Sequence, residues 1–244
     1  MNCVNYIDLL DIEAINKYKL GIEIQDFTEP NLSEKEIKSI VARYKEVFID
    51  FKEIKSLHGP FLDLKPASPD LQIRQVSYDR YLFALNTAAE LEMDYIIFHS
   101  QINPYLDEPS LRRLNNSQNK DFWNKVLDET KYKGLVLIEN IFEETPEMLL
   151  EYIETIDRED IKINLDIGHA KLGEANLEEW IRVLKYHIVY MHIHSNDGVY
   201  DKHISPRIEE IEELFRLLKK YKINPVLSLE YDIEDLDREI NKYI

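Results

Sequence analysis

The amino-acid sequence predicts a (β/α)8 barrel, and two observations lead to this fold class. Short runs rich in β-branched and aromatic residues alternate with longer amphipathic segments along the 244 residues. Several of these runs are nearly continuous in apolar residues, as strands are when both faces of a parallel sheet are buried. Because one such barrel takes about 250 residues, we expect a single domain over residues 1–244. A doubly wound open sheet is the alternative.

Eight strands, each followed by a helix, are expected from this alternation. In chain order the strands are CVNYI (3–7), GIEIQDF (21–27), IKSLHG (54–59), YIIFHS (95–100), LVLIENI (135–141), IKINLDIG (161–168), IVYMHIH (188–194) and PVLSLEY (225–231). A capping box formed by Ser33 and Glu36 marks the start of one helix. Cap residues that precede a proline mark three more, at Ser68-Pro69, Thr145-Pro146 and Ser205-Pro206.

Composition narrows the classes of function. The net charge of −17 repels phosphate backbones at long range, so it does not favour broad nucleic-acid binding. No apolar run reaches the roughly 18 residues of a membrane span, and the start MNCVNYIDLL lacks the basic and apolar blocks of a signal peptide. Cys3 is the only cysteine, which leaves no intrachain disulfide. We therefore expect a cytoplasmic protein without a membrane partner.

Histidines and carboxylates collect where the expected strands end. In a (β/α)8 barrel the catalytic groups lie at the C-terminal ends of the strands and in the loops that follow them. This chain places the following residues there: His58, His99, Glu139, Asn140, Asp166, His169, His192, His194, Asp201, His203 and Glu230. One histidine at a strand end is more simply explained as a hydrogen-bonded structural residue, so the evidence lies in the combination.

Carboxylates inside apolar strands indicate a cation site. Glu139 in LVLIEN, Asp166 in INLDIG and Glu230 in LSLEYD would each cost several kcal/mol to bury without a partner. Three such groups on neighbouring strands would also repel one another, and a divalent cation between them removes both penalties. Mixed imidazole and carboxylate ligands suit Zn²⁺, Mn²⁺, Co²⁺ or Fe²⁺.

The order of these residues resembles the endonuclease IV and xylose isomerase-like barrel superfamily, also called AP endonuclease family 2. Its most specific stretches here are LHGPF, LIEN, LDIGHA and HIHSNDGVYDKH, and the resemblance extends from GIEIQDF to VLSLEYD. The loop after the seventh expected strand departs from it. Ser195 stands where aspartate or asparagine is usual, and ISPRIEEIEE follows His203 where many members have a glycine-x-glycine stretch. This loop is therefore expected to hold its cation or substrate differently.

The resemblance implies two alternative sets of ligands. Endonuclease IV-like members cleave phosphodiesters with three zinc ions, whereas sugar isomerases and epimerases use one Mn²⁺, Co²⁺ or Mg²⁺. The number of cations per chain is therefore left between one and three. Carried over by motif, the first ion would take His58, His99 and Glu139, the second would take Glu139, Asp166, His192 and Glu230, and the third would take His169, Asp201 and His203. The single ion of the isomerases would take the second set.

A cation-dependent isomerase or epimerase of a small sugar or sugar phosphate is the preferred hypothesis. The resemblance implies that the cation polarises a carbonyl and that Glu139 and Glu230 transfer a proton through an enediolate. The acidic surface and the loop 101–118, whose only cationic residues are Arg112 and Arg113, favour a carbohydrate over nucleic acid as the partner. The complete set of nine ligands favours the alternative, a zinc phosphoester hydrolase. No feature favours a third hypothesis, a non-catalytic sensor.

Four further residues are expected near the substrate or behind the ligands. His194 shares a strand face with His192 by two-residue alternation, and we expect it to orient a ligand rather than to bind a cation itself. Asn140, Lys171 and Arg207 complete this set.

Overall fold

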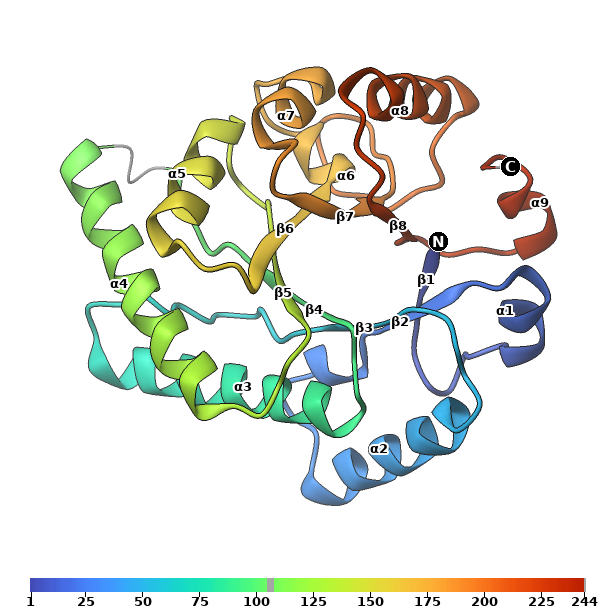
Figure 1. The fold of residues 1–244 in the computed structure, drawn as a ribbon, viewed down its shortest axis with the longest axis horizontal. Coiled ribbons are helices and arrows are strands. Elements are labelled where there is room, and N and C mark those ends of the chain that lie inside the picture. The colour runs from blue at the N-terminus through green and yellow to red at the C-terminus, as the bar shows by residue number, and fades with distance from the viewer. Residues whose placement is uncertain (105–107, 244) are drawn as a thin grey trace.

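The strands of the protein close into a parallel barrel (Figure 1), which confirms the expected fold class and excludes the open sheet. The computed structural model describes residues 1–104 and 108–243. The barrel follows chain order, and β1 pairs with β8 to close it. Its strands are β1 (Asn2–Asn5), β2 (Gly21–Ile24), β3 (Lys55–His58), β4 (Tyr95–His99), β5 (Leu135–Glu139), β6 (Ile161–Asp166), β7 (Ile188–Ile193) and β8 (Val226–Leu229).

Helices surround the barrel, and α9 lies beside α1 across the seam, where Lys17 pairs with Asp237 at 2.8 Å (Figure 1). No helix in the described part of the chain has both the length and the apolar content needed to cross a bilayer. The helices are α1 (Ile12–Tyr18), η1 (Asp26–Thr28, a 3₁₀ turn), α2 (Glu34–Phe48), α3 (Leu71–Glu90), α4 (Pro109–Glu129), α5 (Pro146–Ile156), α6 (Ile167–Ala170), α7 (Leu177–Leu184), α8 (Ile208–Tyr221) and α9 (Leu236–Ile240).

Two of the expected helix starts are wrong by two residues. The Ser33 capping box is present, and Pro146 begins α5. At Ser68-Pro69, however, the helix begins only at Leu71, because the carboxylate of Asp70 accepts from the backbone N–H groups of the first turn. At Ser205-Pro206 the serine hydroxyl donates instead to Glu239 at 2.7 Å, and α8 begins at Ile208.

On β4, β5 and β7 the inward-facing residues change from apolar or aromatic to polar along the strand. Because alternate side chains of a strand point to the same face, the inward residues Ile97, Leu137 and Tyr190, which form a small buried apolar cluster, are followed two positions later by His99, Glu139 and His192. The outward-facing residues of the same strands, among them Phe98, Ile138 and Met191, are fully buried in the main core. The strand register therefore carries the polar residues to the C-terminal mouth of the barrel.

Candidate metal centre

Glu139, Asp166, His192 and Glu230, here called the central group, converge at the barrel mouth. Their ligand atoms all lie within 4.8 Å of one another. Parallel pairing places Asp166 beside His192 in register, and Glu230 follows directly on β8. The Nδ1 atom of His192 lies 2.7 Å from Oε2 of Glu230, 3.3 Å from Oε2 of Glu139 and 3.6 Å from Oδ2 of Asp166.

Unpartnered buried atoms show that the central group fits a cation. Among the described residues, neither Nδ1 of His192 nor Oε2 of Glu230 has a hydrogen-bond partner of acceptable geometry, despite their close approach. Burial alone would raise the pKa values of Glu139 and Asp166, but the surrounding imidazoles outweigh it and hold both well below the ordinary range. The carboxylates therefore stay ionised, and such a set of oxygen and nitrogen ligands suits a divalent cation.

His58 and His99 form a second cluster with Glu139, here called the histidine pair. The Nε2 atom of His58 lies 3.5 Å from Oε2 of Glu139, and that of His99 lies 3.9 Å from Oε1. The Nδ1 atom of His58 contacts the carbonyl oxygen of Gly59 at 2.9 Å, which favours a proton there and a free lone pair on Nε2. Burial lowers the pKa of His99 to about 3, so its imidazole is neutral and able to bind a metal.

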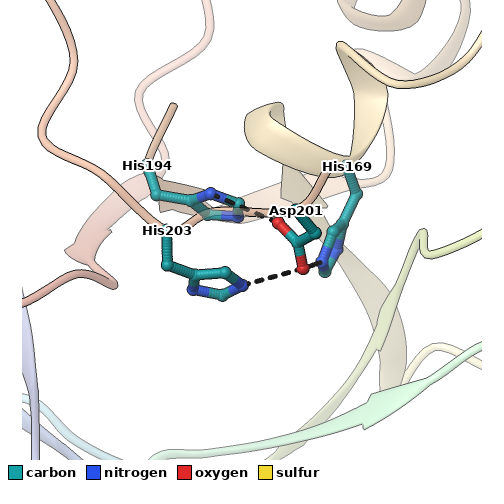
Figure 2. Close-up of side chains that lie close together, drawn as sticks. All are labelled: His169, His194, Asp201 and His203. Atoms are coloured by element: carbon teal, nitrogen blue, oxygen red, sulfur yellow. Dashed lines mark hydrogen bonds and ion pairs between the residues drawn. The ribbon is translucent and has the colours of Figure 1, made fainter. Parts of the chain in front are cut away.

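His169, Asp201 and His203, here called the loop group, meet at one side of the mouth (Figure 2). Oδ2 of Asp201 lies 3.1 Å from Nε2 of His169 and 3.0 Å from Nε2 of His203. The opposite Nδ1 atoms contact the backbone oxygens of Asn140 and Glu230, each at 3.0 Å. Such contacts fix the ring orientation and leave Nε2 of both histidines facing the carboxylate.

His194 lies next to the loop group, and its ring geometry favours a supporting role. Its Nε2 atom is 2.9 Å from Asp166, while Nδ1 faces Oδ1 of Asp201 at 3.8 Å. The ring stacks on that of His203, with centroids 3.9 Å apart and planes 9° apart (Figure 2). A metal binds an imidazole in the plane of the ring, and the in-plane lone pairs of two parallel stacked rings do not meet at one ion. The geometry therefore favours His194 as an orienting partner of Asp166.

The loop that carries Asp201 and His203 is anchored at both ends. Ser195 and Ile204 exchange two backbone hydrogen bonds of 2.7 and 3.0 Å, which close the segment between them. The amine of Lys171 donates to Ser195, Asn196 and Glu210. These contacts tie the loop to α6 and α8.

Asn140, Lys171 and Arg207 contact other residues of the protein, and Asn140 lies behind Asp166. Asn140 exchanges two hydrogen bonds of 2.9 Å with the backbone of Asp166 and so joins the ends of β5 and β6. Lys171 and the exposed Arg207 both contact Glu210, and neither lines the cavity at the barrel mouth.

Three polar residues that sequence reasoning missed hold the central group from behind. Glu23 lies 2.9 Å from Nε2 of His192, Gln25 donates to Oε1 of Glu230 at 2.8 Å, and Asn164 donates to Oε2 of Glu139 at 3.0 Å. Glu23 carries the same sequence signal as Glu139, a carboxylate in an apolar strand, but it lies before the end of its strand. Gln25 and Asn164 carry no comparable signal.

A cavity of about 790 Å³ opens above these groups. Its described lining includes Glu139, Glu230 and His99, together with the aromatic ring of Phe61, which stacks on His99 at 4.3 Å. Lys202 is the only lysine or arginine in that lining, and it pairs with Asp197. The carboxylates in the wall are Asp11, Glu139, Asp201, Glu230, Asp232 and Glu234.

A closed parallel barrel with histidines and carboxylates gathered at its C-terminal mouth has the architecture of a metal-binding (β/α)8 barrel. The chain belongs to the xylose isomerase-like TIM barrel family, whose profile matches residues 19–243. An uncharacterised protein of Methanocaldococcus jannaschii, MJ1614, is 30% identical over 195 residues, which are 75% of this chain and 73% of that protein. A second, MJ1311, is 27% identical over 185 residues, 71% of this chain, and the match spans 63% of its own length.

Solved structures of similar fold include sugar epimerases. A D-tagatose 3-epimerase-like protein superposes with a TM-score of 0.75 at 25% identity, covering 99% of this chain and 95% of that one. L-Ribulose 3-epimerase and D-psicose 3-epimerase share the fold at 14% and 16% identity. The likenesses to L-ribulose 3-epimerase and D-psicose 3-epimerase show that the fold is shared.

Proposed function

We propose that this protein is a cation-dependent isomerase or epimerase of an uncharged sugar. The observation that carries the proposal is the position of Glu139 and Glu230. Both carboxylates belong to the central group and both line the cavity. They therefore adjoin the cation position and are accessible to a substrate in the cavity.

Each glutamate is held in a defined orientation. Asn164 donates to Oε2 of Glu139, and Gln25 donates to Oε1 of Glu230. A bound divalent cation would polarise the substrate carbonyl and stabilise negative charge on its oxygen. The glutamate that starts ionised would take the proton from the carbon next to that carbonyl, and the glutamate that starts protonated would give its proton to the opposite face. The substrate then keeps its number of hydrogens, and the two glutamates exchange protonation states.

The charge of the cavity wall supports an uncharged substrate. A substrate phosphate needs cationic partners such as arginine or lysine. In the described lining only Lys202 offers one, and it already contacts Asp197. Asp11, Asp232 and Glu234 would repel a phosphate from the same wall. Their carboxylates are instead suitable acceptors for the hydroxyl groups of a sugar.

A phosphoester hydrolase is the second candidate, and one observation favours it. All nine residues of the three-ion set occur here, in the central group, the histidine pair and the loop group. The isomerase reaction requires only the central group. The count of bound cations therefore separates the two candidates.

The test combines metal content with activity. Elemental mass spectrometry of protein purified without chelator should give about one manganese, cobalt or magnesium per chain, and the loaded protein should interconvert neutral ketoses and their epimers. Three zinc ions with cleavage of abasic DNA or of bis(p-nitrophenyl) phosphate, and no sugar conversion, would establish the hydrolase instead.

Two matched variants test the roles of the glutamates. Glu139→Gln and Glu230→Gln should each abolish turnover while the circular dichroism spectrum stays unchanged, because a neutral amide cannot accept the substrate proton. Glu209→Gln, an exposed position on α8 outside the described cavity lining, should retain most activity. Turnover that persists in both Glu139→Gln and Glu230→Gln would contradict the mechanism.

A further inference from the structure

Glu23 is a fully buried carboxylate that crosses the barrel interior. Glu23 lies on β2, which pairs with β1 and β3. The hydrogen-bond partners of its carboxylate nevertheless lie on β7 and β8. Its Oε2 atom accepts from the hydroxyls of Tyr190 at 2.6 Å and Ser228 at 2.8 Å. Its Oε1 atom faces Nε2 of His192 at 2.9 Å.

The two carboxylate oxygens of Glu23 have different partners, which indicates more than a structural role. The hydroxyls on Oε2 already offset much of the cost of burying the charge. Oε1 is left to His192, which is also fully buried and whose other nitrogen faces the three carboxylates of the central group. A carboxylate that can only accept requires a proton on Nε2 of His192.

We propose that Glu23 is a positioning residue that holds His192 with Nε2 protonated, so that the lone pair of Nδ1 points at the cation position of the central group. This inference rests on the proposed use of a divalent cation. A carboxylate behind a ligating histidine fixes its tautomer and its orientation and makes the imidazole a better donor to the metal. Without Glu23, the proton could move to Nδ1 and block the ligand atom.

The first test needs no substitution. In zinc-loaded protein labelled with ¹⁵N-histidine, the ring correlations of His192, assigned by their loss in His192→Ala, should show a protonated Nε2 and a zinc-bound Nδ1. Zinc bound through Nε2, or a proton on Nδ1, would overturn the proposal. Because this readout requires no turnover, it is independent of which reaction the protein catalyses.

A pair of variants gives the second test. Glu23→Gln can donate to Nε2 of His192 and so reverse the hydrogen bond. Affinity for Co²⁺, measured by chelator competition at the sites that His192→Ala loses, should fall by about 10- to 100-fold. Ser228→Ala removes a donor to the same carboxylate but leaves its bond to His192, and its Co²⁺ affinity should stay within about threefold of the wild type.

The outcomes separate this inference from the proposed function. Co²⁺ affinity that is unchanged in Glu23→Gln would overturn the role of Glu23, while leaving the isomerase proposal open to its own test. If Glu23→Gln does not fold, the wild-type ¹⁵N spectrum still tests the proposal, because it needs no substitution at Glu23.

Discussion

The central group and the loop group are built from the same kinds of side chain but are held in different ways. The central group lies at the ends of β5 to β8, with side chains at most 10% exposed. In the loop group, Asp201 and His203 lie between β7 and α8, and their side chains are 36% and 35% exposed. Barrel register fixes the first group, whereas a few hydrogen bonds of one loop fix the second. Removing a ligand should therefore have different consequences in the two groups.

The largest effect is expected for His192→Ala. The substitution removes the imidazole that lies near all three carboxylates of the central group. Under the proposed function, the cation and its several kcal/mol of transition-state stabilisation should therefore be lost. Turnover should fall on the order of 10³-fold or more, as steady-state kinetics would show.

His203→Ala is the matched comparison. It should remove at most the cation of the loop group and leave the metal content of the central group unchanged, as measured by elemental mass spectrometry. Equal loss of metal in the two variants would mean that the groups bind as one unit, which would end the distinction between them.

A smaller effect is expected for Gly168→Ala, which acts on the contact between the groups. A Cβ at Gly168 would lie 2.0 Å from Cε1 and 2.3 Å from Nδ1 of His194. Because that ring is buried between Asp166 and His203, overpacking should cost about 1–3 kcal/mol of unfolding free energy. Denaturant unfolding would measure it.

Gly198→Ala serves as the control for this substitution. Gly198 has a φ of 79°, and nothing lies within 4 Å of an added Cβ, so only backbone strain of about 1 kcal/mol is expected. A larger cost at Gly198 than at Gly168 would contradict the packing argument.

The smallest effect is expected for Lys171→Met, which loosens the anchor of the loop. Burial would raise the pKa of Glu210, but hydrogen bonds from Lys171, Arg207 and Ser195 outweigh it and lower the pKa from 4.5 to about 2. Since the folded-state pKa is depressed, the ionised carboxylate stabilises the fold above pH 4.5, and this contribution is lost as the pH falls from 4.5 towards 2.

Unfolding of the wild type and of Lys171→Met should therefore differ by about 1 kcal/mol at pH 7, and the difference should shrink below pH 4.5. Lys202→Met, which breaks only the exposed pair with Asp197, should change stability little at either pH. A gap between wild type and Lys171→Met that is independent of pH would contradict the role of Glu210.

The sequence predicts the barrel and the central group well because both depend on strands. Glu139, Asp166 and Glu230 each lie at the end of an apolar run. Because the strands of the barrel are parallel, these ends meet at one mouth, and this placement does not depend on the conformation of the loops. Glu23 is also a carboxylate in an apolar run, but it lies before the end of its strand. Only the strand register in the structure shows that Glu23 faces His192 across the interior.

Contacts made by loops were less predictable. The segment GIEIQDF continues past β2 into η1, so Gln25 is not a strand residue, and its bond to Glu230 depends on that turn. Lys171 was expected near the substrate or behind the ligands, and the sequence did not indicate that its amine lies against Ser195, Asn196 and Glu210. A long flexible side chain can reach several partners, and which one it contacts depends on the fold of the neighbouring loop.

Asp166 is at once a member of the central group and the N-cap of α6, where its side chain accepts from the backbone N–H of His169 at 2.7 Å. Helix geometry sets the three-residue spacing between the cap residue Asp166 and the N–H of His169. The spacing of the D-x-x-H motif therefore does not depend on a bound ion. An insertion or deletion between these two residues would destroy the cap and separate the two side chains. The motif should therefore keep its length in relatives that have exchanged one metal, or one reaction, for another.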